Sequence, residues 1–377
     1  MNMRRGSLRF LTAMLLLGST VRAGDGVPSV GKWLEVMKDN GAVMRWQASD
    51  LTYDLHHKCL WAIADQNGAA NLKDGKRIGP AKHVFWIDIP TNAVKSAAAR
   101  PIEIEFDPKE FEAVKAIIPP DEWARGLDFE GFVAVPATLN MFYACTEGTY
   151  PLLLRLEYVE AKGEKKETMK VKHITRISRR DNRDDSDDHD INSRWEGLTI
   201  NHEGTRLFLA SQRPASDSRP RIYTLLVKDF VGKASLQADP HSEVEPMALK
   251  DVRLPGATIS ALQYVPPNSL DKTHPGFLLA LNRNPLEKVY IIDLAYLRYE
   301  PRVVMLDLHA PGAQDGTKFK TKGMSPEGLA VDVETNRAWL INDPLAQYYA
   351  VPAGAGDGRF KNEVPMLFDL ELKHFVP

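Results

Sequence analysis

Asp128-Phe129-Glu130-Gly131-Phe132 decides the fold, because the chain repeats this phrase. It returns as Arg194-Trp195-Glu196-Gly197-Leu198 and as Ser325-Pro326-Glu327-Gly328-Leu329, with weaker copies at Ser49-Asp50-Leu51-Thr52-Tyr53 and Ser260-Ala261-Leu262-Gln263-Tyr264. The anchor residues Ser49, Glu130, Glu196, Ser260 and Glu327 are separated by 81, 66, 64 and 67 residues. A repeat at nearly constant spacing is typical of a repeat architecture.

Each copy of the phrase opens the same series of predicted strands. After Glu196, strands are expected at 197–200, 206–211, 221–227 and 247–254. Short strands with regular turn signals predict an all-β sandwich, barrel or propeller, and about four strands in a unit of this length match a propeller blade. The sequence therefore predicts an all-β fold, a β-propeller of four-stranded blades. Five blades are favoured, and six are the alternative.

The outer strands follow from the same alignment of units. Third strands are expected at 83–89, 151–158, 221–227, 288–294 and 348–352. A sixth blade would have to come from residues 28–48, where 42–46 is instead a candidate closing strand.

The first 23 residues are predicted to be a secretory signal peptide that is removed. Arg4, Arg5 and Arg9 precede an apolar run at 10–17, and Val21-Arg22-Ala23 has the small-x-small pattern of a cleavage site. The apolar run is too short to span a bilayer, although a membrane-anchored N-terminus is the alternative. We therefore expect a secreted or periplasmic protein with no transmembrane segment after cleavage.

Residues 24–377 are predicted to form a single β-propeller domain with an insert near 107–127. Residues 108–115 within the insert have helical spacing. Removal of residues 1–23 takes away four Arg and no acid, so the formal charge changes from −2 to −6. A mildly acidic chain argues against nucleic acid as a partner, since such binding needs a basic face.

Two cysteines, Cys59 and Cys145, lie in apolar strand-like runs of different units. An exported protein can form a disulfide, so one bridge and two separately buried thiols are both open.

Strand order predicts a polar rim around the propeller axis. The inner strand of a blade starts on the face to which the second strand returns, so the anchors share a rim with the residues after the second strands. Those residues are polar or ionisable although the strands before them are apolar: Asp65-Gln66, Glu147, Gln212-Arg213, Asn282-Arg283 and Asn342-Asp343.

Glu130, Glu196 and Glu327 are the predicted metal ligands. Carboxylates crowded around one axis repel one another unless a positive charge lies between them. Ca²⁺ fits best because it accepts many carboxylate and carbonyl oxygens with flexible geometry. The alternative is structural, with each Glu binding backbone amides and locking the blades together.

Other rim residues are candidates for ligand binding and catalysis. Arg213 and Arg283 could grip the phosphate or carboxylate of a small anionic ligand through fork geometry, or could pair with rim acids instead. Three further residues beside them are predicted ligand contacts: Gln212, Asn282 and Glu147. Asp65 and Asp343 are the candidate general bases for a metal-bound water.

An acidic loop at 179–190 is a second, weaker calcium candidate. It contains Asp181, Asp184, Asp185, Asp187, Asp188 and Asp190, but its spacing does not match an EF-hand. A solvated loop is the favoured interpretation.

Several phrases resemble a known family. DFEG at 128–131, SRWEGLTINHEGTRLFLASQ at 193–212, GFLLALNR at 276–283 and SPEGLAVDVETNRAWLIND at 325–343 are similar to the phytase-like domain called "esterase-like activity of phytase" and to the related SdiA-regulated propellers. The resemblance covers roughly residues 45–350. It implies an exported β-propeller with calcium and a connection to phosphate esters.

Three hypotheses for function follow. The first is a metal-assisted hydrolase of a phosphate ester, acting at the rim that carries the Glu-Gly phrases. The second is a non-catalytic propeller that binds a ligand or protein partner there. The third is a lactonase-type hydrolase. The chain has no Gly-x-Ser-x-Gly elbow, Walker loop or His-Glu-x-x-His motif, so nothing indicates a nucleophilic mechanism.

Overall fold

The computed structural model describes residues 26–36, 46–65, 72–73, 76–77, 83–90, 96–123, 126–178, 195–211, 221–249, 252, 254, 258–267, 273–284, 287–310, 325–344 and 364–376. The predicted signal peptide, the acidic loop at 179–190 and the rim residues Gln212 and Arg213 lie outside this part of the chain.

Every anchor of the repeated phrase lies in the first of four strands that pair antiparallel, each with the next. We number these sets of four strands as blades one to five. Blade one contains β3 (Ala48–Asp54), β4 (Cys59–Ala64), β7 (His83–Ile87) and β8 (Ser96–Glu105). Blade two contains β9 (Phe129–Ala134), β10 (Met141–Thr146), β11 (Leu152–Val159) and β12 (Thr168–Ile177).

The other three blades follow the same order. Blade three contains β13 (Trp195–Ile200), β14 (Arg206–Ser211), β15 (Ile222–Leu226) and β17 (Met247–Ala248). Blade four contains β18 (Thr258–Val265), β19 (Phe277–Asn284), β20 (Lys288–Asp293) and β21 (Arg302–His309). Blade five contains β22 (Pro326–Asp332), β23 (Arg337–Asn342), β24 (Met366–Glu371) and β2 (Lys32–Glu35).

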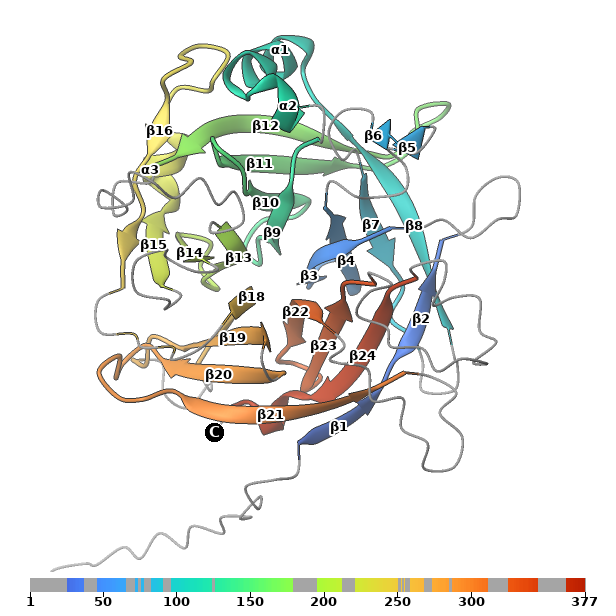
Figure 1. The fold of residues 1–377 in the computed structure, drawn as a ribbon, viewed down its shortest axis with the longest axis vertical. Coiled ribbons are helices and arrows are strands. Elements are labelled where there is room, and N and C mark those ends of the chain that lie inside the picture. Colours follow the sequence, from blue (N-terminus) through green and yellow to red (C-terminus); the bar gives the residue numbers. More distant parts are fainter. Residues whose placement is uncertain are drawn as a thin grey trace, which may run out of the picture.

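The five blades stand around a common centre with their first strands innermost (Figure 1). Five clusters of buried apolar side chains fill the spaces between neighbouring blades, one cluster for each neighbouring pair, including the pair of blades five and one. Leu51 of β3, for example, packs in one cluster with Trp339 of β23. The predicted all-β propeller fold is confirmed, and the number of blades in the whole chain stays a prediction.

Burial explains why the inner and outer strands have different sequences. β13 and β22 are buried at every residue, since blades cover both of their faces. Strands covered on both faces are expected to be almost continuously apolar. The outer strand β12 alternates between buried and more exposed residues because one of its faces contacts solvent.

The N-terminal segment supplies the fourth strand of blade five, as expected for this part of the chain, but with other residues than the predicted 42–46. β2 pairs antiparallel with β24 and parallel with β8, so it lies between blades five and one. The third strand of blade five is β24, whereas a strand was expected at 348–352, which lies outside the described residues. The candidate closing strand 42–46 lies almost wholly outside them, and β2 occupies the place predicted for it.

The remaining elements lie outside the inner ring. The predicted insert contains α1 (Pro108–Ile117) and α2 (Pro120–Trp123), and Asp107 caps α1 by accepting a hydrogen bond from the backbone N–H of Lys109. The others are short: β1 (Val27–Val30), which pairs with β21, β5 (Leu72–Lys73), β6 (Lys76–Arg77), α3 (Val227–Val231), β16 (Glu243–Val244) and a 3-10 helix (Leu372–His374).

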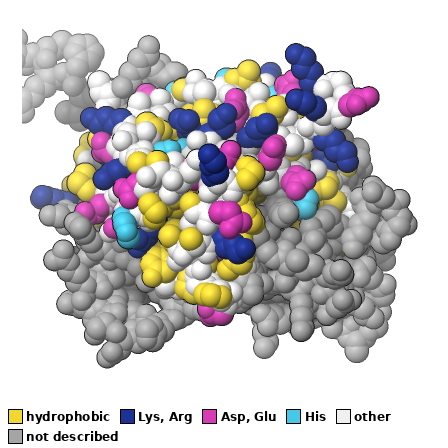
Figure 2. All heavy atoms as spheres, turned by 90° about the horizontal axis from the view of Figure 1, so that it is seen from above, with side chains coloured by type: hydrophobic (Ala, Val, Ile, Leu, Met, Phe, Trp, Pro, Cys, Tyr) yellow, Lys and Arg dark blue, Asp and Glu magenta, His cyan; other side chains and the backbone are white. Residues whose placement is uncertain are grey.

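Cys59 in β4 and Cys145 in β10 are both buried free thiols, in different blades. On the face drawn in Figure 2, basic side chains are interspersed with acidic and apolar ones. None of the helices in the described part of the chain is both long and apolar enough to cross a membrane.

Candidate functional site

All five anchors of the repeated phrase lie at β-bulges. The regular register between the inner and second strand of each blade shifts at the anchor, and the pairing skips that position: Ser49, Glu130, Glu196, Ser260 and Glu327. A bulge leaves one residue unpaired and re-aims its side chain. The phrase therefore recurs because the same backbone irregularity opens every inner strand.

The glycine after the anchor allows neighbouring inner strands to approach closely. A Cβ atom on Gly197 would lie 2.7 Å from the backbone N of Leu262 in the next blade. A Cβ atom on Gly328 would lie 2.5 Å from the backbone N of Leu51. Real Cβ atoms do not come so close to backbone atoms, so only glycine fits at these positions.

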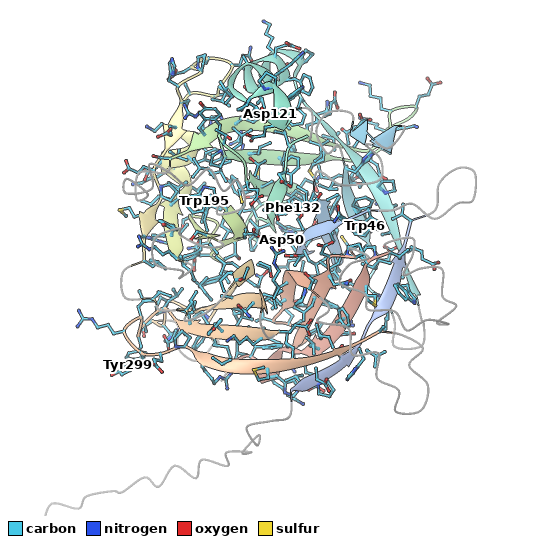
Figure 3. All side chains as sticks on the ribbon, in the orientation of Figure 1. Trp46, Asp50, Asp121, Phe132, Trp195 and Tyr299 are labelled. Carbon is cyan, nitrogen blue, oxygen red and sulfur yellow. The ribbon has the colours of Figure 1, made fainter. Side chains whose placement is uncertain are left out.

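Blade one has aspartate where blades two, three and five have this glycine, and Asp50 ties inner strands together. Asp50 is buried, and Figure 3 shows it near the middle of the ring with Phe132 nearby. Its Oδ2 accepts a hydrogen bond from the backbone N of Phe132 at 2.8 Å, and its Oδ1 accepts one from the backbone N of Leu51 at 2.8 Å. The backbone N–H of Leu329 is a third donor. One carboxylate thus joins β3, β9 and β22.

The residues after the second strands return to the anchor end, as strand order predicts. The backbone N of Glu147 donates to the carbonyl of Asp128 at 2.9 Å, and that of Asp343 donates to the carbonyl of Ser325 at 2.9 Å. The backbone N of Asp65 donates to the carbonyl of Gln47 in the same way, at 3.2 Å. We call this end of the ring, with the five anchors and Asp65, Glu147, Arg283 and Asp343, the Glu-Gly rim.

Three carboxylates of blade two converge on the Glu-Gly rim. Oxygen atoms of Asp128, Glu130 and Glu147 all lie within 4.8 Å of one another. Calcium holds its oxygen ligands at 2.3–2.6 Å, so two ligands of one ion are at most about 5 Å apart. The three oxygens are therefore close enough to share one ion.

This group differs from the predicted set Glu130, Glu196 and Glu327. Only Glu130 belongs to both, because the other two anchors come from different blades around the axis, whereas Asp128 and Glu147 flank Glu130 on its own blade. Asp128 was missed as a candidate ligand. Its place in the phrase, two residues before the anchor, was the available signal.

Two rim carboxylates have a buried oxygen that accepts no hydrogen bond. They are Oε2 of Glu147 and Oε2 of Glu327. The exposed fraction of these residues is 8% and 3%. A buried carboxylate oxygen without a donor is unfavourable, and a cation at the rim would satisfy it.

Arg283 is the positive charge that the described part of the rim provides. Its guanidinium forms an ion pair with Oε1 of Glu327. Burial lowers the pKa of Arg283, but the carboxylates of Glu327, Glu196 and Glu130 outweigh burial and raise it. One arginine faces seven carboxylates that act on one another: Asp65, Asp128, Glu130, Glu147, Glu196, Glu327 and Asp343.

The rim carboxylates hold protons more tightly than ordinary glutamates do. Burial raises the pKa of Glu130 and of Glu147, and for both the charge of Glu196 raises it further. Burial also raises the pKa of Glu327, although Arg283 opposes this rise. Glu130 and Glu147 on blade two therefore have raised pKa values to which, among the described residues, no cation of their own blade is opposed.

These shifts predict that the calcium-free protein becomes more stable as the pH falls towards about 5.5. The pKa values of these glutamates are above the usual 4.5 in the folded state. At pH values between the unfolded-state and folded-state pKa, the folded protein therefore binds more protons than the unfolded chain. The free energy of unfolding therefore decreases as the pH rises through that window. In urea unfolding with chelator, the free energy of unfolding is expected to be larger at about pH 5.5 than at about pH 8, by about 1 kcal/mol or more.

The double variant Glu130→Gln with Glu147→Gln is the control for this pH dependence. It removes two of the four carboxyl groups with raised pKa values, and Asp50 and Glu327 remain, so its stability should change less between the two pH values. Equal pH dependence in the variant and the wild type would contradict the assignment.

The other predicted site residues take different places. Asn282 is fully buried, and its Oδ1 accepts a hydrogen bond from the backbone N of Thr258 at 2.7 Å. The candidate bases Asp65 and Asp343 both contact Gln47, which donates from Nε2 to Oδ1 of Asp343 at 3.2 Å. Gln47 was missed by sequence reasoning because its blade carries the weakest copy of the phrase.

Comparison with known proteins gives only distant likenesses. No family model matches the chain, and no curated protein matches it either. Among solved structures, hydrazine synthase of Kuenenia stuttgartiensis is 13% identical, with 89% of this chain and 83% of that chain covered and a TM-score of 0.33. The β-propeller domain of Cps50 (Swd1) from Myceliophteria thermophila is 11% identical, with 88% and 85% covered and a TM-score of 0.34. Superpositions this weak carry no argument about the site.

Proposed function

We propose that this protein is a calcium-binding β-propeller whose Glu-Gly rim binds a small anionic ligand. The observation that supports the proposal most directly is the group of Asp128, Glu130 and Glu147, with oxygens within 4.8 Å of one another. The buried, unbonded Oε2 of Glu147 adds to it, since that atom needs a partner. All three groups offer carboxylate oxygens, which a hard cation prefers.

Calcium is the favoured ion for reasons of chemistry and location. A site of carboxylates from a bulge and a strand end has no imposed octahedral geometry, which suits Ca²⁺ better than Mg²⁺. We expect the protein to be secreted or periplasmic, on the basis of the predicted signal peptide at 1–23. Extracellular calcium modules work with Kd values of about 10⁻⁴–10⁻³ M, which a partly buried three-carboxylate group can provide.

We infer an anionic ligand from the two positive centres that the rim would contain, the bound ion and Arg283. The ion would offset two of the three charges of the blade-two carboxylates, and Arg283 already offsets the charge of Glu327. Both positive centres lie on one rim, because Arg283 occupies in blade four the register position that Glu147 occupies in blade two. A carboxylate or phosphate group is the chemistry that both centres attract.

Calorimetric titration with Ca²⁺ tests the proposal. The wild type is expected to bind with a Kd of about 1 mM or tighter, and Glu147→Gln should weaken binding at least about tenfold, because a ligand charge is removed from the site. Glu164→Gln is the matched control, since Glu164 is exposed on the 160–167 hairpin. Equal calcium affinity in Glu147→Gln and the wild type, or no binding at all, would overturn the metal site.

Hydrolysis of a phosphate ester is the second candidate function. The observation that favours it is that Asp343 and Asp65 lie on the same rim as the carboxylate group and are joined through Gln47. Either could take a proton from a water activated by the ion. The resemblance to the phytase-like family supports the same choice of substrate.

Parallel assays distinguish hydrolysis from binding alone. Phosphomonoester, phosphodiester and lactone substrates are tested with calcium and with chelator. A rate that needs calcium and falls at least about 100-fold in Asp343→Asn or Asp65→Asn supports catalysis by that residue. Background rates on all three substrates would leave the calcium-dependent binding protein as the function.

A further inference from the structure

A second opening lies at the opposite end of the inner strands. β13 begins at the Glu-Gly rim with Glu196 and reaches Ile200 four residues later, about 13 Å away along the strand. Ile200 lines a pocket of about 100 Å³. All five inner strands or the turns after them contribute residues to this pocket, so it lies on the propeller axis.

The wall of this axial pocket is apolar. Val133, Pro136, Ile200 and Val331 line it, and each comes from an inner strand or the residues that directly follow one. The first, third and fourth of these are buried, so the wall is part of the packed ring rather than a mobile surface. A concave apolar wall with a few polar groups is the usual form of a small-molecule site.

The polar part of the pocket carries negative charge. Asp332 and Glu334 line it, whereas its lining includes neither lysine nor arginine. Asp332 is held in place, because its Oδ1 accepts the backbone N–H of Glu334 at 3.0 Å. Glu334 is exposed at the turn between β22 and β23, so its carboxylate is available at the mouth.

Two tyrosines stand beside these acids. Tyr53 and Tyr264 both line the pocket, and Asp332 accepts a hydrogen bond from the Tyr53 hydroxyl. Aromatic rings attract cations through their faces. Carboxylates and tyrosines thus both favour a positively charged group, and the apolar wall favours a hydrocarbon group.

We propose that this axial pocket binds a small ligand that joins an apolar group to a protonated amine. The apolar group packs against Val133, Ile200 and Val331, and the ammonium faces Glu334 and Asp332. This site is separate from the Glu-Gly rim in place and in charge preference. It needs no metal, so it is independent of the calcium proposal.

Binding of three matched probes tests the proposal: 2-phenylethylamine, 2-phenylethanol and phenylacetate. They have similar size and differ in charge. Titration calorimetry of the full protein in chelator is expected to give the amine a Kd of about 1 mM or tighter. The alcohol should bind at least about tenfold more weakly and the carboxylate not at all. Equal binding of amine and alcohol, or no binding of the amine, would overturn the proposal.

Variants at the mouth locate the binding site. Val333→Trp places a large side chain over the pocket and should abolish amine binding, whereas Val231→Trp, an equally exposed valine on α3, should leave it unchanged; these valines are 45% and 39% exposed. Glu334→Gln should weaken the amine severalfold and leave the alcohol unchanged, with Glu164→Gln as its control. Unchanged amine binding in folded Val333→Trp would overturn the assignment to this pocket.

Discussion

Arg283→Met is expected to lower the free energy of unfolding of the calcium-free protein by about 3–5 kcal/mol at neutral pH. The Arg283 side chain is 21% exposed and pairs with Glu327, whose side chain is 5% exposed. Methionine keeps most of the volume but leaves the Glu327 carboxylate buried without its cation. The charges of Glu196 and Glu130, which Arg283 also offsets, then repel it further. Urea unfolding measures the loss.

Two comparisons separate the charge effect from general damage. Lys172→Met removes a surface pair, Lys172–Glu157, whose partners are 43% and 42% exposed, and should change stability by about 1 kcal/mol or less. Adding Glu327→Gln to Arg283→Met removes the orphaned charge and should restore part of the loss. A loss for Arg283→Met no larger than that of Lys172→Met would show that the rim does not need its arginine.

Calcium should oppose the effect of Arg283→Met. A bound ion at Asp128, Glu130 and Glu147 would supply positive charge to the same group of rim carboxylates. Saturating calcium is therefore expected to stabilise the variant more than the wild type.

Asp50→Ala is expected to lower the free energy of unfolding by about 3 kcal/mol or more, because each buried donor left without an acceptor costs about 1–3 kcal/mol. The Asp50 carboxylate accepts from the backbone N–H groups of Leu51, Phe132 and Leu329. Alanine leaves all three donors buried at the junction of β3, β9 and β22. Thermal and urea unfolding both report the change.

Asp50→Asn is the matched variant. Its amide keeps the shape and one acceptor oxygen, so its loss should be smaller than that of Asp50→Ala. Burial raises the pKa of Asp50 well above its usual value, so the native carboxylate is itself held unfavourably. If Asp50→Asn lowered the free energy of unfolding as much as Asp50→Ala, the shape and the remaining acceptor would contribute nothing to stability. The interpretation that Asp50 joins three strands by hydrogen bonds would then be wrong.

The Glu-Gly rim combines features that reduce stability and features that suggest function. Buried carboxylates with raised pKa values and unbonded oxygens weaken the fold in the absence of a ligand. Such groups are typical of binding and catalytic sites, although structural ion-pair networks also shift pKa values. Arg283 offsets part of the charge, and the calcium proposed at blade two would offset more.

Much of the fold was readable from the repeated phrase. The bulge at each anchor and the glycine after it are local requirements, so every blade that keeps them repeats the letters Glu-Gly. Strand order alone then placed Glu147, Arg283 and Asp343 near the anchors, because a second strand that runs antiparallel to the inner strand ends where the inner strand begins. The second strands, such as Cys59–Ala64, are almost wholly apolar, and this pattern likewise indicated burial on both faces.

The errors came from long-range pairing. The third strand of blade five, Met366–Glu371, follows a long connection after Asn342, and a nearer apolar stretch at 348–352 was chosen in its place. The strand that completes blade five, Lys32–Glu35, comes from the other end of the chain. Sequence spacing gives no signal for a partner more than 300 residues away.

The sequence by itself determined the repeating blade, the bulged anchor with its glycine and the existence of a polar rim, because these depend on a few neighbouring residues. Only the tertiary structure decided which rim residues lie together. Asp128, Glu130 and Glu147 lie together on one blade. Glu327 forms an ion pair with Arg283, and the Asp50 carboxylate accepts hydrogen bonds that join three strands. The reason is that distances between blades are set by how the strands pack around the axis, which no local pattern encodes.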